Sequence, residues 1–188
     1  MRPDGLVLAG GPGRRAGEPK AALVLAGRTL VERAVDLLLP RCGRVIVVSR
    51  AGVALPPLVV PVVLDRPGPD APLVGLATGL AALDARDVIV LACDLPLAGP
   101  ALDVLQQTPA STAVVAAEAG RAQPLCARYP RAPALQACDR RIARGALAAM
   151  GLVDELGAAV VEVPAGSLLN VNTAQDLARA EQVFLARG

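Results

Sequence analysis

Short apolar runs alternate along the chain with segments of helical period, and no other feature constrains the fold as much. The runs are rich in Val, Leu and Ala, so they predict strands at residues 5–10, 44–49, 58–64, 87–92, 112–117, 121–129 and 158–163. Helices are predicted between them at residues 29–39, 73–83, 100–107, 133–150 (broken near Gly145) and 173–186. This alternation predicts an α/β fold of three layers, with a Rossmann-like, mainly parallel sheet covered by helices on both faces.

Several element ends carry local sequence signals. Thr29 followed by Glu32 forms a capping-box pattern at a helix start, and Thr173 with Asp176 repeats it with an aspartate. Pro61 weakens the third predicted strand, because proline lacks the N–H that a central strand needs. That strand is therefore expected at an edge of the sheet.

The predicted topology points to one edge of the sheet as the ligand site. In sheets of this type ligands bind beyond the carboxyl ends of the strands. The loops that follow the first and fourth predicted strands, residues 10–20 and 93–96, are expected to meet there.

Composition excludes several classes of function. The chain has no histidine, which rules out Ser-His-Asp and Cys-His catalysis and every His-ligated metal site. Its net charge of +2 and its 1% of aromatic residues argue against nucleic-acid binding, which uses basic patches and stacking rings. No run of about 18 apolar residues is free of charges, Pro and Gly, so no membrane-spanning helix is predicted.

The cysteine pattern indicates a reducing compartment. Cys42, Cys93, Cys126 and Cys138 include no C-x-x-C pair, and no signal peptide is recognisable. Buried, reduced thiols in a cytoplasmic protein are the prediction.

A glycine-rich loop, LAGGPGRRAGEPK at residues 8–20, follows the first predicted strand. Its glycines would let backbone N–H groups approach phosphate oxygens closely. Arg14, Arg15 and Lys20 add positive charge that would hold a triphosphate and stabilise a departing pyrophosphate. Lys20 is the only lysine, whereas the other 18 of the 19 Lys and Arg residues are arginines, so its compact ammonium predicts a specific role.

Two other interpretations of this loop stay open. Residues 11–16, GPGRRA, match the G-x-G-x-x-A dinucleotide fingerprint, which would indicate a nicotinamide-dependent oxidoreductase. That fingerprint requires a helix to begin inside the motif, and Gly17 and Pro19 interrupt it. A plain connection between strand and helix is the second alternative. A Walker A loop is excluded, because the sequence contains no G-K-[ST].

Asp94 is the candidate metal ligand. It follows the fourth predicted strand within Cys-Asp-Leu-Pro, so its carboxylate is expected at the ligand edge. Mg²⁺ prefers oxygen ligands and usually takes one or two carboxylates together with substrate phosphates. The alternative is an aspartate that only caps the turn before Pro96.

Asn170 and Asn172, the only asparagines, lie at alternate positions of an extended segment and therefore on one side of it. They stand just before the last predicted helix, whose N-terminus favours anions. Amides both donate and accept, which suits a phosphorylated acceptor. In the alternative interpretation Asn172 only precedes the Thr173 cap.

Four motifs in a fixed order resemble those of the molybdenum cofactor guanylyltransferase (MobA) family and its NTP-transferase relatives. The likeness spans residues 6–177, and the motifs are LAGG…R…G…PK from Leu8, CDLP around Asp94, QPL from Gln123 and NVNTAQDL from Asn170. The double glycine and the paired asparagines are typical of the guanylyltransferases. Pro19 is commoner in the cytidylyltransferase relatives.

The resemblance implies a set of site residues and a fold of the nucleotide-diphospho-sugar transferase type. Residues 1–100 would form the nucleotide half of a single domain, residues 1–188, and residues 101–188 its acceptor half. Lys20, Arg15 and Asp94 would be catalytic, and Asp94 would bind Mg²⁺. Gln123, Asn170 and Asn172 would bind the acceptor. The nucleotide would be bound by Leu8, Ala9, Gly10, Gly11, Gly13, Arg14, Lys20, Ser49, Asp65 and Asp94.

The implied reaction is transfer of GMP from GTP to a molybdopterin-type molybdenum cofactor, with release of pyrophosphate. GTP and the molybdopterin cofactor would be the substrates, and transient contacts with cofactor-insertion proteins or molybdoenzymes fit this role, whereas nucleic acid and membranes do not. The alternatives are a CTP-dependent molybdopterin cytidylyltransferase, a 2-phospholactate guanylyltransferase and, in a different class, an NAD(P)-dependent oxidoreductase.

Overall fold

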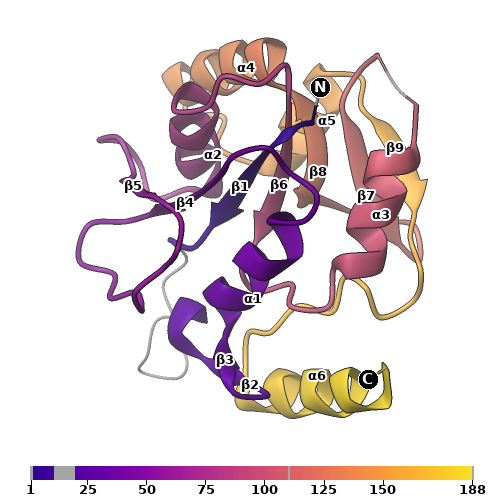
Figure 1. Ribbon diagram of the computed structural model, residues 1–188. Coiled ribbons are helices and arrows are strands. Elements are labelled where there is room, and N and C mark those ends of the chain that lie inside the picture. Colours follow the sequence, from indigo (N-terminus) through magenta and orange to yellow (C-terminus); the bar gives the residue numbers. More distant parts are fainter. Residues whose placement is uncertain (1, 11–19, 110, 188) are drawn as a thin grey trace.

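The computed structural model describes residues 2–10, 20–109 and 111–187. Its centre is a seven-stranded sheet with the strand order β5-β4-β1-β6-β8-β7-β9 (Figure 1). Within this sheet β8 is antiparallel to β6 and β7, and the other pairs are parallel, so the sheet is mainly parallel, as predicted. The strands are β1 (Asp4–Leu8), β4 (Val45–Ser49), β5 (Val62–Leu64), β6 (Asp87–Ala92), β7 (Val114–Glu118), β8 (Arg121–Pro130) and β9 (Ala159–Glu162).

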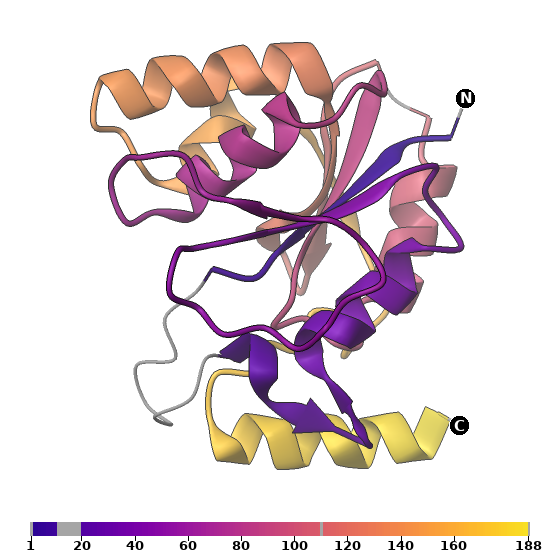
Figure 2. The ribbon, with the colours of Figure 1, turned by 60° about the vertical axis from the view of Figure 1, so that its left-hand side comes forward.

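Helices cover both faces of the sheet (Figures 1 and 2). Successive strand residues serve opposite faces: Val7 packs with the helices of one face, and its neighbour Leu6 with those of the other. The three-layer α/β prediction is therefore confirmed. The first face carries α1 (Leu30–Leu38) and α3 (Gly99–Gln107), and the second carries α2 (Pro72–Ala81), α4 (Arg131–Ala143) and α5 (Ala149–Glu155).

A third, smaller core lies beside the sheet, where α6 (Ala174–Arg187) packs against a short hairpin (Figure 2). The hairpin joins β2 (Val24–Leu25) to β3 (Arg28–Thr29), and its turn has positive φ angles of 44° at Ala26 and 79° at Gly27. This hairpin was not predicted, because strands of two residues carry no periodicity. The core contains Leu25, Leu30, Leu97, Val171 and Ala180.

The local signals at element ends are confirmed at several places. The Thr29 backbone N–H donates to Glu32 Oε2 at 2.8 Å, and the Glu32 N–H donates to Thr29 Oγ1 at 3.4 Å, so the capping box at α1 is formed. β5 is an edge strand of the sheet. β5 is shorter than predicted and begins only after Pro61. The Pro61 carbonyl still accepts from the Val47 N–H, but proline has no N–H to donate, so the regular pairing does not extend further back.

The predicted helix at residues 133–150 is broken near Gly145, as expected, where φ is 69°. The prediction was wrong about its end, since α5 continues to Glu155. α5 buries Leu152 and Val153 in the core, and this packing outweighs the low helix propensity of Gly151.

α2 approaches the sheet closely at Gly79. A Cβ atom at this position would lie 2.3 Å from Leu6 Cδ1, closer than Cβ atoms come to their neighbours in proteins, so the helix or the leucine would have to shift. The glycine therefore lets α2 settle onto β1. One turn earlier, a Cβ at Gly75 would lie 3.4 Å from Leu8 Cδ2, so the first turn of α2 stands directly beside the carboxyl end of β1.

The four cysteines, Cys42, Cys93, Cys126 and Cys138, are buried and form no disulfides, as predicted. Burial raises the pKa of three of these thiols, Cys42, Cys126 and Cys138, to about 12, so they stay protonated at neutral pH. No helix in the described part of the chain has the length and apolar character needed to cross a membrane.

Candidate active site

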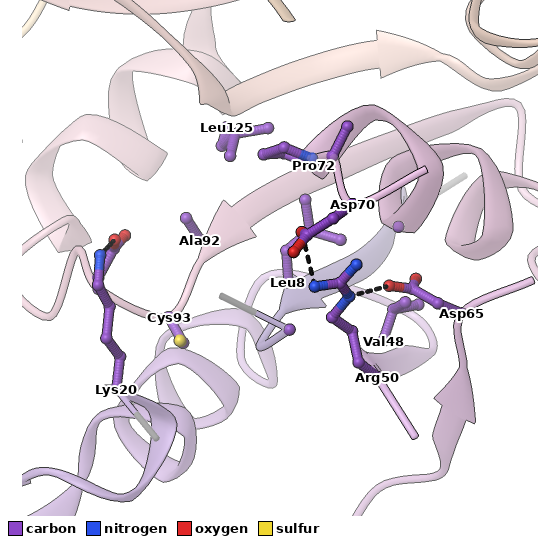
Figure 3. Close-up of a pocket in the computed structure, with 14 residues that line it drawn as sticks. Leu8, Lys20, Val48, Arg50, Asp65, Asp70, Pro72, Ala92, Cys93 and Leu125 are labelled. Atoms are coloured by element: carbon purple, nitrogen blue, oxygen red, sulfur yellow. Dashed lines mark hydrogen bonds and ion pairs between the residues drawn. The ribbon is translucent and has the colours of Figure 1, made fainter. Parts of the chain in front are cut away.

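A cavity of about 200 Å³ opens at the carboxyl edge of the sheet, beside the ends of β1, β4 and β6. Lys20 and Asp94 line one end of it, and Arg50, Asp65 and Asp70 line the other. Figure 3 shows Lys20 and Arg50 on opposite sides of the close-up, with Leu8 between them. Gly10 and Lys20, at the described ends of the segment after β1, line the cavity together with Cys93 and Asp94 from the loop after β6, as the predicted topology requires.

The Lys20 ammonium joins three segments that are distant in the sequence. Lys20 opens a short 3₁₀ turn, Lys20–Ala22, and its Nζ lies 3.2 Å from Asp94 Oδ2 in the loop after β6. The same Nζ donates to Asn172 Oδ1 in the segment before α6. The side chains of Lys20 and Asp94 are 23% and 17% exposed, so the pair is open to a ligand yet largely shielded from water.

The Asn170–Asn172 segment is fixed by backbone and side-chain bonds. The Val171 N–H donates to the Asp94 carbonyl at 2.8 Å, and the Val171 side chain is buried in the core beneath α6. Asn172 Nδ2 donates to Asn170 Oδ1 at 2.7 Å. Asp176 caps α6, since its Oδ2 accepts from the backbone N–H of Asn172 at 3.0 Å. Asn172 therefore both precedes the helix cap and reaches Lys20.

Asp94 sits in a desolvated position. Burial raises the pKa of its carboxyl group, and the Lys20 ammonium opposes that shift both through its charge and through its hydrogen bond. The described residues contain no group of three or more His, Cys, Asp and Glu side chains that could hold a metal ion. A single carboxylate of this kind fits Mg²⁺, which takes its remaining ligands from phosphates and water.

The far end of the cavity is built around Arg50, which directly follows β4. Its Nη1 lies 2.6 Å from Asp70 Oδ1, and its Nε lies 3.8 Å from Asp65 Oδ2. Burial raises the pKa of Asp65, and the positive charge of Arg50 opposes this. Gly10 allows the arginine to lie close to β1, because a Cβ there would stand 2.9 Å from Arg50 Cγ.

Five of the residues predicted to bind nucleotide line this cavity: Leu8, Gly10, Lys20, Asp65 and Asp94. Two others do not. Ala9 is buried behind the strand end, and Ser49 is buried with its Oγ unpaired among the described residues, so the structure does not bring either to the cavity wall. Gly11, Gly13, Arg14 and Arg15 lie outside the described residues.

The predicted acceptor residue Gln123 lies in an irregular part of β8. The register between β7 and β8 jumps here, from Val115 opposite Ala127 to Ala116 opposite Gln123. Leu125, within this bulge, lines the cavity. Gln123 does not line it, and its Oε1 accepts from the Leu125 N–H at 3.4 Å.

Arg50 and Asp70 line the cavity but were not predicted from the sequence. The signal for Arg50 was its position at the carboxyl end of a predicted strand, one residue beyond Ser49. Asp70 follows a Pro-Gly-Pro segment, and nothing in its sequence context indicates which side chain it would meet.

An α/β domain whose lysine and carboxylate face one cavity at the carboxyl edge of a parallel sheet has the features of a nucleotidyltransferase. The chain belongs to the MobA-like NTP transferase family, whose model matches residues 5–157. The family expected from the four motifs is therefore confirmed.

A relative with a similar sequence agrees with this assignment, and solved structures share the fold. The molybdenum cofactor guanylyltransferase of Cereibacter sphaeroides is 36% identical over 196 aligned positions, covering 98% of each chain. Among solved structures, molybdopterin-guanine dinucleotide biosynthesis protein A from Archaeoglobus fulgidus has a TM-score of 0.77 at 22% identity, covering 97% of this chain and 99% of that one. The 2-C-methyl-D-erythritol 4-phosphate cytidylyltransferase of Thermus thermophilus has a TM-score of 0.75 at 26% identity and covers both chains completely.

Proposed function

We propose that the protein is a molybdenum cofactor guanylyltransferase, which transfers GMP from GTP to the terminal phosphate of a molybdopterin-type molybdenum cofactor and releases pyrophosphate. The observation that carries this proposal is the Lys20 ammonium, which lies 3.2 Å from Asp94 Oδ2 and also donates to Asn172. A cation for phosphates, a carboxylate for a metal and an amide for the acceptor thus meet at one point. The guanylyltransferase relative, similar along nearly its whole length, supports the choice of substrates.

The reaction is an in-line displacement at the α-phosphorus of GTP. An oxygen of the acceptor phosphate forms the new bond to this phosphorus, and the bond to the bridging oxygen of pyrophosphate breaks. The second pKa of a phosphate monoester is near 6, so the attacking oxygen is already ionised at neutral pH. No general base is required, which agrees with a chain that has no histidine.

Catalysis then consists of positioning and charge stabilisation. Lys20 leaves its partners Asp94 and Asn172 and binds the phosphate oxygens that gain charge as pyrophosphate departs. Asn170 and Asn172 orient the acceptor phosphate through amide hydrogen bonds. Gln123 is proposed on the acceptor side, and Arg15, Arg14, Gly11 and Gly13 on the phosphates of GTP.

Asp94 is the residue that would hold Mg²⁺. When bound, the ion neutralises phosphate charge and aligns the α-phosphate for attack. Mg²⁺ would need a hard, ionised oxygen ligand close to the phosphate-binding lysine. The partly buried Asp94 carboxylate is such a ligand.

The test is a matrix of nucleotides and acceptors. Purified protein with Mg²⁺ receives GTP or CTP, each with molybdopterin cofactor, 2-phospholactate or no acceptor, and pyrophosphate release is measured. GTP with the molybdopterin cofactor should give the highest rate, and Asp94→Asn serves as the inactive control. A preference for CTP would instead indicate the molybdopterin cytidylyltransferase. Turnover with 2-phospholactate but not with the molybdopterin cofactor would indicate the 2-phospholactate guanylyltransferase.

The oxidoreductase alternative has its own test. NAD(P)H should not raise the melting temperature, whereas Mg·GTP should. The reverse result would overturn the nucleotidyltransferase proposal.

We also propose that the enzyme is cytoplasmic and that it passes its product on through transient contacts with cofactor-insertion proteins or molybdoenzymes.

A further inference from the structure

The two ends of the cavity differ in the chemistry they offer a nucleotide. Lys20 is the cation at one end, so the phosphates belong there. Apolar groups of Leu8, Val48 and Pro72 line the space that leads away from it. A flat base bound between such groups would turn its polar edge towards Arg50, which lines the far end.

Arg50 is held in position before any base arrives. Asp70 Oδ1 accepts at 2.6 Å from Nη1, and Asp65 Oδ2 stands 3.8 Å from Nε. Neither ion pair uses Nη2. The side chain is 28% exposed, so the guanidinium is neither buried in protein nor free in water.

The surroundings of Arg50 leave little freedom to move. Gly10 admits its methylene stem close to β1, since a Cβ there would stand 2.9 Å from Arg50 Cγ. Asp65 packs closely against α2, because a Cβ atom added at Gly75 would lie only 3.1 Å from Asp65 Oδ1. A guanidinium restrained in this way presents its remaining N–H donors in a fixed plane.

We propose that Arg50 is the residue that selects the base, by donating two hydrogen bonds to O6 and N7 of guanine; this inference rests on the proposed guanylyltransferase function. Arginine meets these two adjacent acceptors with a matching pair of donors. Adenine carries an amino group where guanine has O6, and cytosine carries one at C4, so both turn a donor towards the guanidinium. Uracil offers a single acceptor, O4, and no N7.

The discriminating experiment uses nucleotide analogues with the wild-type protein, so it does not depend on a variant folding. kcat/KM is measured for GTP, for ITP, which keeps O6 and N7, for 2-aminopurine riboside triphosphate, which lacks O6, and for 7-deaza-GTP, which lacks N7. ITP should remain within a few-fold of GTP. The other two analogues should each lose about tenfold or more, the range for one mispaired base contact.

The variant Arg50→Met should remove this discrimination, so that GTP and the two poor analogues react at similar, lowered rates. Arg44→Met is the matched control, because Arg44 stands at the opposite end of β4 and pairs with exposed Asp84. It should keep the wild-type order of substrates. Both variants are checked for folding by their melting temperatures.

The outcomes separate the two proposals. If GTP is the preferred substrate but the wild-type enzyme treats the analogues alike, or Arg50→Met keeps the wild-type ratios, the assignment of Arg50 is wrong and the guanylyltransferase proposal stands. If CTP is preferred, or no nucleotide reacts with the cofactor, the proposed function fails and this inference fails with it.

Discussion

Asp94 illustrates at the scale of single residues how a site can oppose the stability of its own fold. Burial raises the pKa of its carboxyl group above the ordinary value. The ionised carboxylate therefore destabilises the folded protein relative to the unfolded chain, in which the group is solvated. This destabilisation is fully present above the raised pKa and disappears as the pH falls below the ordinary value. Lys20 offsets part of it at 3.2 Å.

Asp94→Asn should therefore abolish Mg²⁺-dependent turnover without lowering the melting temperature at neutral pH. An amide removes the buried charge and also removes the anionic ligand that the ion needs. The variant should be as stable as wild type or more so at pH 7, with the difference shrinking as the pH approaches 4. Differential scanning calorimetry and the pyrophosphate assay measure the two effects. Wild-type turnover in the variant would refute the metal assignment.

Lys20→Met should reduce kcat/KM for GTP by at least about a hundredfold, the scale found when one donor to a developing charge is removed. The methionine keeps an unbranched side chain of similar length but leaves Asp94 without its cation. Because that carboxyl is partly buried, a modest loss of stability is also expected. Lys20→Arg is the companion variant, and since a planar guanidinium cannot replace the compact ammonium, it should recover little activity. A folded Lys20→Met enzyme with normal rates would refute the catalytic role.

At the scale of elements, α2 and β8 form the walls that bring these side chains together. α2 lies close to β1 because of Gly79, and its first turn brackets Asp65 through Gly75. β8 leaves its regular register near Gln123, and the bulge brings Leu125 to the cavity. Gly79 and Gln123 thus help to shape the two walls without lining the cavity themselves.

Gly79→Ala should destabilise the protein by about 1–3 kcal/mol, the usual range for overpacking a core. Its new Cβ would meet Leu6 Cδ1 at 2.3 Å, so either the helix or the leucine must shift. Gly99→Ala in α3 is the control, because its Cβ would stand at an ordinary 3.5 Å from Leu37 Cδ2. Urea denaturation compares the two free energies of unfolding, and equal values would contradict the packing argument.

Tyr129 holds the β8 bulge from inside the core. Its hydroxyl donates to the Pro124 carbonyl at 2.8 Å, and Tyr129 is fully buried. Tyr129→Phe should cost about 1–3 kcal/mol, because a buried acceptor loses its donor. If the bulge also positions the acceptor, KM for the molybdopterin cofactor should rise more than KM for GTP, which changes only through the contact of Leu125 with the cavity. An equal change in the KM values for GTP and for the molybdopterin cofactor would show that Tyr129 has a purely structural role.

At the scale of the whole molecule, the sequence predicted the sheet and the Lys20–Asp94 end of the cavity, but at the other end it predicted only Asp65 and not Arg50 or Asp70. Apolar strands and helix caps are local signals, and the topology of a parallel sheet then places the loops after β1 and β6 together. The meeting of Arg50 with Asp65 and Asp70 depends on the paths of two irregular loops, and no local pattern encodes it. Ser49, by contrast, was predicted at the site and lies buried, because a one-residue step along a strand reverses the direction of the side chain.

The bond between Lys20 and Asn172 has a thermodynamic consequence for how the two substrates bind. In this structure the Lys20 ammonium holds the Asn172 side chain through its amide oxygen, and so fixes an amide whose N–H groups would bind the acceptor phosphate. A triphosphate that draws Lys20 away releases this amide, so the first substrate prepares the place of the second. Linkage then requires the effect to be reciprocal, with each substrate raising the affinity for the other by the same factor. Calorimetric titration of the cofactor, with and without a non-hydrolysable GTP analogue, should show this cooperativity, and Lys20→Met should abolish it.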